Sequence, residues 1–177
     1  PEPTADYYTD ELLNEAKEFS DTAVIVIARV GGEGTDLPTD LGAKDEEGNN
    51  LYTYTDNSTE YSDFESGQHY LELSQTERNM VNIVCKNFDH VIVICNSSNA
   101  MELGWVDEYK QIGSVISCPG AGETGFAALG KILNGEVNPS GKLADTYVYD
   151  LTATPAFNNF GDFTYENMDE FGWEESN

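Results

Sequence analysis

The sequence predicts an α/β fold, a three-layer sandwich with a largely parallel central sheet that is flavodoxin-like in outline. Residues 23–28 and 90–95 are almost entirely apolar, and residues 114–117 form a third, shorter run. Continuous apolar runs of this length are typical of strands that are buried on both faces of a parallel sheet. Segments with helical spacing lie between them, and this alternation is the pattern of layered α/β domains.

Four helical segments are predicted around these strands. They cover residues 9–19, residues 74–87, a short stretch from Met101 to Val106, and residues 126–133. The second has the clearest start, because Ser74 and Glu77 have the spacing of a capping box. In that motif the Ser hydroxyl and the Glu carboxylate each accept a hydrogen bond from the other residue's backbone N–H.

The segment from Gly31 to Gly67 is polar, rich in turn residues and without a sustained period. It is predicted to be a long loop, and we expect residues 34–67 to pack loosely. The 177 residues have the size of one domain. We therefore expect a single α/β domain over residues 1–177, with a linker over about residues 1–7 and an irregular aromatic tail over about residues 152–177.

The composition excludes several classes of partner. The chain has 33 Asp and Glu against 8 Lys and Arg, a formal net charge of -25, which repels nucleic acids and anionic membrane surfaces. No apolar stretch reaches the length of a membrane span, and the start of the chain has no signal-peptide pattern. We expect a soluble chain of open cellular location, with three free cysteines, Cys85, Cys95 and Cys118.

The best candidate for chemistry is Glu33, which follows the first predicted strand and is flanked by glycines that let the backbone approach a ligand. Four other carboxylates in the same loop are rivals: Glu46, Glu47, Glu60 and Glu65. At the level of local sequence alone, an exposed glutamate in a flexible turn is the favoured interpretation of Glu33, so spacing by itself does not select catalysis.

A second pattern, Gly120 to Gly125, matches G-x-G-x-x-G and leaves dinucleotide binding as a weaker hypothesis. It follows the third strand instead of the first, and a turn at residues 138–142 interrupts the unit before Asp145. His69 and His90 have no metal-ligand or triad partner at a recognisable spacing. We therefore expect neither a cofactor nor a metal.

Four motifs, in order along the chain, resemble the second domain of glycoside hydrolase family 3, the (α/β)6 sandwich of β-glucosidases and β-xylosidases. They are Glu33-Gly34-Thr35-Asp36, Leu71-Glu72-Leu73-Ser74, Met101-Glu102-Leu103-Gly104-Trp105-Val106, and the highly specific run from Ala128 to Leu143 that contains Val137-Asn138-Pro139-Ser140-Gly141-Lys142. Together the matches span residues 23–146. Two features depart from the family pattern: Leu37 replaces a basic residue, and residues 40–67 form a long insertion.

The resemblance implies that Glu33 is the general acid/base of a retaining β-glycosidase, with Asp36 and Arg29 as substrate-binding residues. It also implies a β-glucoside or β-xyloside substrate and a separate TIM-like barrel domain that carries the nucleophilic Asp. The chain has no barrel signature, and a TIM barrel alone takes about 250 residues, so we expect the isolated chain to be inactive. The alternative is a non-catalytic carbohydrate-binding or partner-docking module.

Overall fold

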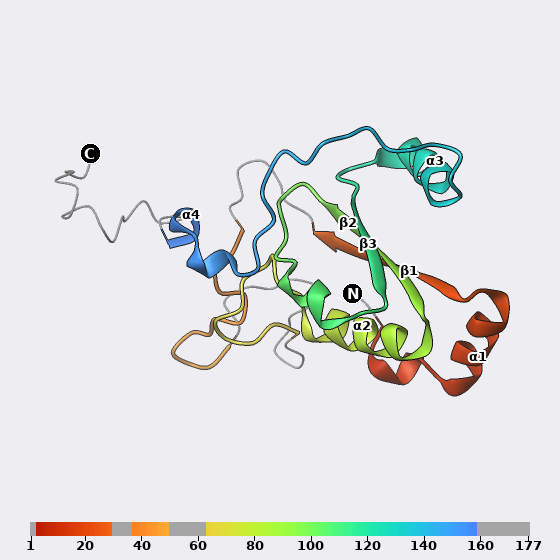
Figure 1. Ribbon diagram of the computed structural model, residues 1–177. Helices are drawn as coiled ribbons and strands as arrows, with labels where there is room; N and C mark the ends of the chain where they lie inside the picture. Colours follow the sequence, from red (N-terminus) through yellow and green to blue (C-terminus); the bar gives the residue numbers. More distant parts are fainter. Residues whose placement is uncertain (1–2, 30–36, 50–62, 159–177) are drawn as a thin grey trace.

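The computed structural model describes residues 3–29, 37–49 and 63–158. Helices and strands alternate along the chain from the red N-terminal end to the blue C-terminal segment (Figure 1). Their order is η1 (Ala5–Tyr7), α1 (Asp10–Phe19), β1 (Thr22–Arg29), α2 (Gln75–Asn87), β2 (His90–Ser97), η2 (Gly104–Glu108), β3 (Ile112–Ser117), α3 (Gly122–Leu133), η3 (Leu151–Ala153) and α4 (Pro155–Asn158).

The three strands form one parallel sheet in the order β1-β2-β3. β1 and β2 pair over their whole length, with Ile25 opposite Val93. β2 and β3 pair with a register shift between Val91 and Ile92. The predicted α/β fold with a parallel sheet is therefore confirmed, and each strand runs one to two residues beyond its apolar run at one or both ends.

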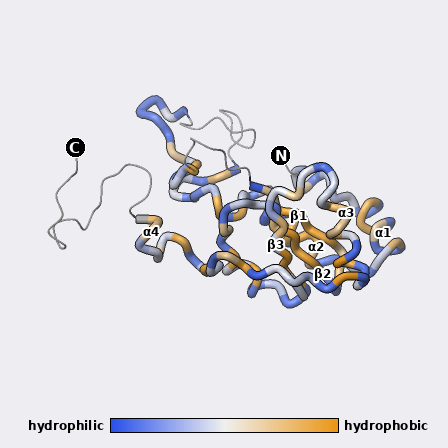
Figure 2. Tube along the Cα trace, turned by 90° about the horizontal axis from the view of Figure 1, so that it is seen from above, coloured by the Kyte–Doolittle hydropathy of each residue, from blue (hydrophilic) through white to orange (hydrophobic). Residues whose placement is uncertain are grey.

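One face of the sheet carries the hydrophobic core. Ile25 and Ile27 of β1 and Val93 of β2 face it, and Val81 and Cys85 of α2 pack against them. α2 lies along this face, and α3 lies on the opposite side of the sheet (Figure 1). Viewed from above, hydrophobic residues are concentrated in the strands (Figure 2).

The second face of the sheet is covered less completely. Val24 and Val26 point to it from β1, and each is 47% exposed. Ile94 of β2 and Leu129 of α3 are buried. This face of the sheet is therefore covered at β2 but left partly open at β1. The helix–sheet–helix arrangement is thus asymmetric in the described part of the chain.

The helix starts follow the capping signals. The Thr9 hydroxyl accepts a hydrogen bond from Leu12 N before α1, and both hydrogen bonds of the capping box predicted at Ser74 are present. α3 begins at Gly122, a turn earlier than the apolar pattern predicts, because glycines precede Phe126 and hide the helical period. None of the described helices has the length and apolar character needed to cross a membrane.

Hydrogen bonds join the two described ends of the long connection between β1 and α2. Leu41 N donates to Gln68 O (2.7 Å), Tyr70 N donates to Pro38 O (3.3 Å), and Gly67 N donates to the Asp40 carboxylate (2.8 Å). Leu41 is fully buried. The expectation of loose packing is therefore wrong for residues 41–42 and 63–64, which are buried, whereas residues 46–49 and 65–67 are exposed. The middle of the segment, residues 50–62, lies outside the described residues.

A substitution at Gly42 tests how closely the two ends of this connection pack against each other. A Cβ atom at this position would overlap the Glu65 carbonyl group and Ser66 N. We expect Gly42→Ala to lower the free energy of unfolding by about 1–3 kcal/mol, since the neighbouring backbone must move. Gly113 of β3 has open space around it, so Gly113→Ala should be neutral or slightly stabilising. Urea denaturation measures both, and equal effects would contradict the close approach.

Cys95 gives a prediction in alkaline solution. Its thiol is buried on the core side of β2, and this burial raises its pKa from the ordinary 9.0 to about 11. Below pH 9 the thiol is neutral in both states. Above pH 9 the unfolded chain loses the proton while the folded chain keeps it, so the free energy of unfolding falls as pH rises from 9 to 11, by about 2–3 kcal/mol at most.

The measurement is urea denaturation at several pH values, with Cys95→Ala as the control. The variant starts from a lower stability because its side chain is smaller, but its decline between pH 9 and 11 should be shallower. Equal slopes in the two proteins would show that Cys95 does not titrate differently on unfolding.

Candidate active site

The carboxyl ends of the strands mark the candidate site. β1 ends at Arg29, β2 at Ser97 and β3 at Ser117, and ligands of parallel α/β sheets bind beyond such ends. Of the three predicted site residues, only Arg29 is described. Glu33 and Asp36 lie outside the described residues, so their positions are limited only through their described neighbours.

Arg29 is buried although it is charged, with 7% of its surface exposed. It follows Ile25 and Ile27 in the two-residue period of β1, so its side chain points to the core face. There its Nη1 donates to Glu77 Oε1 and its Nη2 donates to Glu77 Oε2. Both side chains are almost fully buried, so this bidentate pair joins the end of β1 to the first turn of α2.

The remaining donors of Arg29 bind backbone carbonyl groups. Nε donates to Tyr70 O (2.6 Å), Nη2 to Glu72 O (2.6 Å) and Nη1 to Ala28 O (2.8 Å). The guanidinium carbon also lies 5.3 Å from the ring centroid of Tyr70 and 5.8 Å from that of Phe64, within the range of cation–π attraction. Arg29 therefore holds three parts of the chain together: the end of β1, the segment 70–72 and the start of α2.

The first turn of α2 carries the carboxylate that binds the Arg29 guanidinium group. Glu77 also accepts a hydrogen bond from Ser74 N (2.9 Å), so one carboxylate serves both the capping box and Arg29. Asp63 is buried beside it and accepts from Thr76 N (2.7 Å). Two carboxylates at the positive end of a helix dipole are favourable, and both are occupied by structural hydrogen bonds.

Tyr70 holds both ends of the segment that contains the predicted catalytic residue. Its carbonyl oxygen accepts from Arg29, and its N–H donates to the carbonyl oxygen of Pro38. Glu33 follows Arg29 by four residues, so its Cα lies within about 14 Å of the Arg29 Cα. Asp36 precedes Leu37, at about 3.8 Å between Cα atoms. The described residues that flank both candidates, Arg29 and Pro38, are therefore joined through Tyr70.

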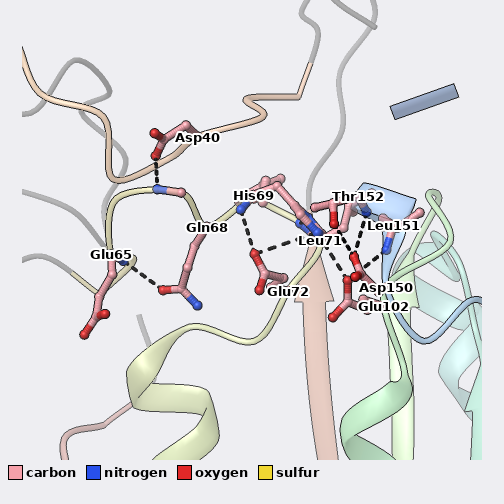
Figure 3. Close-up of polar contacts among 12 residues, drawn as sticks. Asp40, Glu65, Gln68, His69, Leu71, Glu72, Glu102, Asp150, Leu151 and Thr152 are labelled. Atoms are coloured by element: carbon pink, nitrogen blue, oxygen red, sulfur yellow. Dashed lines mark hydrogen bonds and ion pairs between the residues drawn. The ribbon is translucent and has the colours of Figure 1, made fainter. Parts of the chain in front are cut away.

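A second polar cluster is formed by His69, Glu72 and Glu102 (Figure 3). The Glu72 carbonyl oxygen, which accepts from Arg29 Nη2, connects this cluster to the ion pair of Arg29 and Glu77. His69 is buried, and its Nδ1 accepts a hydrogen bond from Leu71 N (3.2 Å), which places the ring proton on Nε2. Nε2 lies 3.3 Å from Glu102 Oε2 and 3.7 Å from Glu72 Oε2. The sequence showed no partner for His69; the i,i+3 spacing to Glu72 was the only local signal.

This cluster attaches the C-terminal part of the described chain. Glu102 Oε2 also accepts from Leu151 N (3.0 Å), and the His69 ring lies 5.1 Å from the Phe157 ring. Asp150 caps the short helix η3, and hydrogen bonds from the Thr152 hydroxyl and N–H keep the pKa of its carboxyl below the usual range. Residues 150–157 therefore pack beside the segment that Arg29 holds.

The rival carboxylates that the structure describes, and the glycine-rich run, lie outside the network around Arg29. Glu46, Glu47 and Glu65 are exposed, and Glu60 lies outside the described residues. In the Gly120 to Gly125 run, Gly120 and Gly122 have φ angles of +52° and +62°, values that favour glycine. Gly120 N donates to Asn96 Oδ1 (3.2 Å). A tight turn between β3 and α3 accounts for these glycines, and dinucleotide binding stays an untested prediction.

A surface cleft of about 420 Å³ lies elsewhere, between the end of α2 and residues 107–111. Tyr109 crosses it to donate to Asn82 Oδ1 (2.8 Å). Because α2 ends just before β2 begins, this cleft is at the amino edge of the sheet. We therefore place the candidate active site at the carboxyl edge, where Arg29 lies.

A substitution of Glu77 tests how much its buried ion pair with Arg29 contributes to stability. In Glu77→Ala the Arg29 guanidinium stays buried without its carboxylate, and we expect the free energy of unfolding to fall by about 3–5 kcal/mol. The control is Glu108→Ala, which removes the exposed pair with Arg78 (3.7 Å) and should change stability by less than about 1 kcal/mol. Urea denaturation at pH 7 compares them, and a small effect at Glu77 would mean that the ion pair contributes little.

Known proteins match both the sequence and the fold. Residues 7–174 match the family model of the glycosyl hydrolase family 3 C-terminal domain. Beta-glucosidase A of Butyrivibrio fibrisolvens is 34% identical over 160 residues, which is 85% of this chain and 18% of the relative. A beta-glucosidase of Ruminococcus albus is 30% identical over 151 residues, 85% of this chain and 13% of the relative.

A solved structure agrees with these matches. The crystal structure of a beta-glucosidase from Paenibacillus barengoltzii superposes with a TM-score of 0.62 at 28% identity, covering 87% of this chain and 14% of that one. The chain thus spans less than a fifth of the length of the proteins it matches. Because the family model covers nearly the whole sequence, the resemblance seen in its motifs is confirmed, and this chain belongs to glycosyl hydrolase family 3, as a C-terminal domain of that family.

Proposed function

We propose that this chain supplies the general acid/base carboxylate, Glu33, to a retaining β-glycosidase whose nucleophile lies on a companion TIM-like barrel domain. The observation that carries the proposal is the anchored carboxyl end of β1: Glu33 follows Arg29 by four residues, in a segment whose two ends bind Tyr70. The relatives named above are beta-glucosidases, which favours a β-glucoside over a β-xyloside.

Retaining hydrolysis assigns two successive tasks to the acid/base. In the first step the protonated carboxyl donates its proton to the glycosidic oxygen while a second carboxylate attacks the anomeric carbon and the aglycone leaves. In the second step the same residue, now ionised, removes a proton from water, which releases the sugar with retained configuration. A glutamate that follows the carboxyl end of β1 suits both tasks, because ligands of parallel α/β sheets bind beyond the carboxyl ends of the strands.

The second carboxylate must lie about 5–5.5 Å from the first. Glu77 and Asp63 are the buried carboxylates at the base of this connection, and hydrogen bonds within the domain occupy both. A separate domain is therefore the better source of the nucleophile. We further propose that Asp36 accepts hydrogen bonds from sugar hydroxyl groups. A neutral glucoside is compatible with the strongly acidic chain, since it is not repelled by it.

Glu33→Gln tests the assignment in the protein that joins this chain to its barrel domain. For an alkyl β-glucoside, whose alkoxide leaves poorly, kcat/KM should fall by about 100- to 10,000-fold, because protonation of the leaving group is lost. An activated aryl glucoside needs little protonation, so its glycosylation step should fall far less. Azide, which attacks without a general base, should partly restore turnover of the activated substrate.

Two controls accompany this experiment. Glu65→Gln changes an exposed carboxylate of the same connection and should leave both substrates unaffected. The isolated 177-residue chain should not hydrolyse either one, because the proposed nucleophile lies on the barrel domain. Unchanged hydrolysis of the alkyl glucoside by Glu33→Gln would reject the acid/base role and favour the non-catalytic module. Glucoside hydrolysis by the isolated chain, lost in Glu33→Gln, would reject the separate nucleophile.

A further inference from the structure

We propose that Arg29 is a positioning residue for Glu33 rather than a substrate contact: it fixes the point and direction in which the chain leaves β1. The inference rests on the proposed function of Glu33 and adds a residue that acts through it. Until that test is made, a direct contact between Arg29 and the sugar stays the competing prediction.

The first argument is the complete use of the guanidinium group. Arginine has five N–H donors, and all five have acceptors within the domain. They are Tyr70 O for Nε, Ala28 O and Glu77 Oε1 for Nη1, and Glu72 O and Glu77 Oε2 for Nη2. A sugar hydroxyl could bind Arg29 only by displacing one of these bonds inside a buried site.

The second argument is the location of those acceptors. Ala28 precedes Arg29 on β1, Glu77 is in the first turn of α2, and Tyr70 and Glu72 lie in the segment that leads to α2. Tyr70 also binds Pro38, on the far side of Glu33. The Arg29 side chain therefore fixes the end of β1 relative to Tyr70, and through Tyr70 relative to Pro38.

The third argument is the sensitivity of catalysis to position. A displacement of about 1 Å can lower a rate by about 100-fold, and only four residues separate Glu33 from Arg29. Lysine retains the charge but has one nitrogen with three donors, and it cannot reproduce the planar fork. Arg29→Lys should therefore keep the ion pair with Glu77 and loosen the backbone contacts.

The experiment is a double-mutant cycle of Arg29→Lys and Glu33→Gln in the protein that joins this chain to its barrel domain. Arg29→Lys alone should lower kcat/KM for an alkyl β-glucoside by about 10- to 100-fold, with little change for an activated aryl glucoside or in KM. In the Glu33→Gln background it should cause no further loss, because the residue it positions is gone. Arg78→Lys, at the exposed pair on α2, should be silent in both backgrounds.

Each other outcome is decisive. A rise in KM for both substrates, or a loss that multiplies with that of Glu33→Gln, would show that Arg29 contacts the sugar or acts independently, and would overturn the inference alone. Wild-type rates in Arg29→Lys would do the same. If Glu33→Gln itself has no effect, the proposed function fails and the inference fails with it.

A second variant guards against misfolding. Circular dichroism at the assay temperature establishes that Arg29→Lys is folded. If it is not, Glu77→Gln replaces it in the cycle, since the amide keeps the size of the carboxylate and one acceptor oxygen for Arg29. It should show the same selective loss on the alkyl glucoside and the same absence of further loss with Glu33→Gln, and an unselective loss would count against the positioning role.

Discussion

The buried ion pair between Arg29 and Glu77 is the constraint on which the carboxyl edge of this domain depends. Removing two charges from water is costly, and a buried pair is tolerated only where further hydrogen bonds satisfy both partners. Here Arg29 donates to three backbone carbonyl groups besides Glu77, and Glu77 accepts a hydrogen bond from Ser74 N. The pair cannot shift without leaving several of these groups unsatisfied, so it fixes the end of β1 against the start of α2 in one geometry.

This geometry explains how a long connection is accommodated beside the segment that carries the proposed acid/base. The insertion over residues 40–67 separates the Glu-Gly-x-Asp motif from α2 and could have displaced it. Instead, Leu41 and Gln68 are hydrogen-bonded to each other, and Gly42 lies against the backbone of Glu65 and Ser66. The insertion therefore leaves and re-enters the domain at one place. Lengthening a loop whose ends are already held costs little free energy, so the segment that carries Glu33 keeps its own anchors at Arg29 and Pro38.

The elements of the fold were predictable because their signals are local. Apolar runs located β1, β2 and β3, and the capping box at Ser74 placed the start of α2. The polar contacts were not predictable in the same way, since Arg29 and Glu77 are 48 residues apart and His69 and Glu102 are 33 apart. One signal was available: Arg29 continues the inward alternation of Ile25 and Ile27, which requires a buried partner. Naming that partner needed the packing of α2 on the sheet.

The proposed site, divided between two domains, places a particular demand on each of them. Two carboxyl groups that must stand about 5–5.5 Å apart cannot rely on a flexible loop for either position, because errors from the two sides add. In the sequence Glu33 stands between Gly32 and Gly34, and glycine has the greatest backbone freedom of all residues. Under the proposed function, the flanking residues Arg29 and Pro38 must limit the position of Glu33, and both bind Tyr70. Arg29, the last residue of β1, has all five of its N–H donors bound within the domain, and the segment that carries Glu33 begins immediately after it.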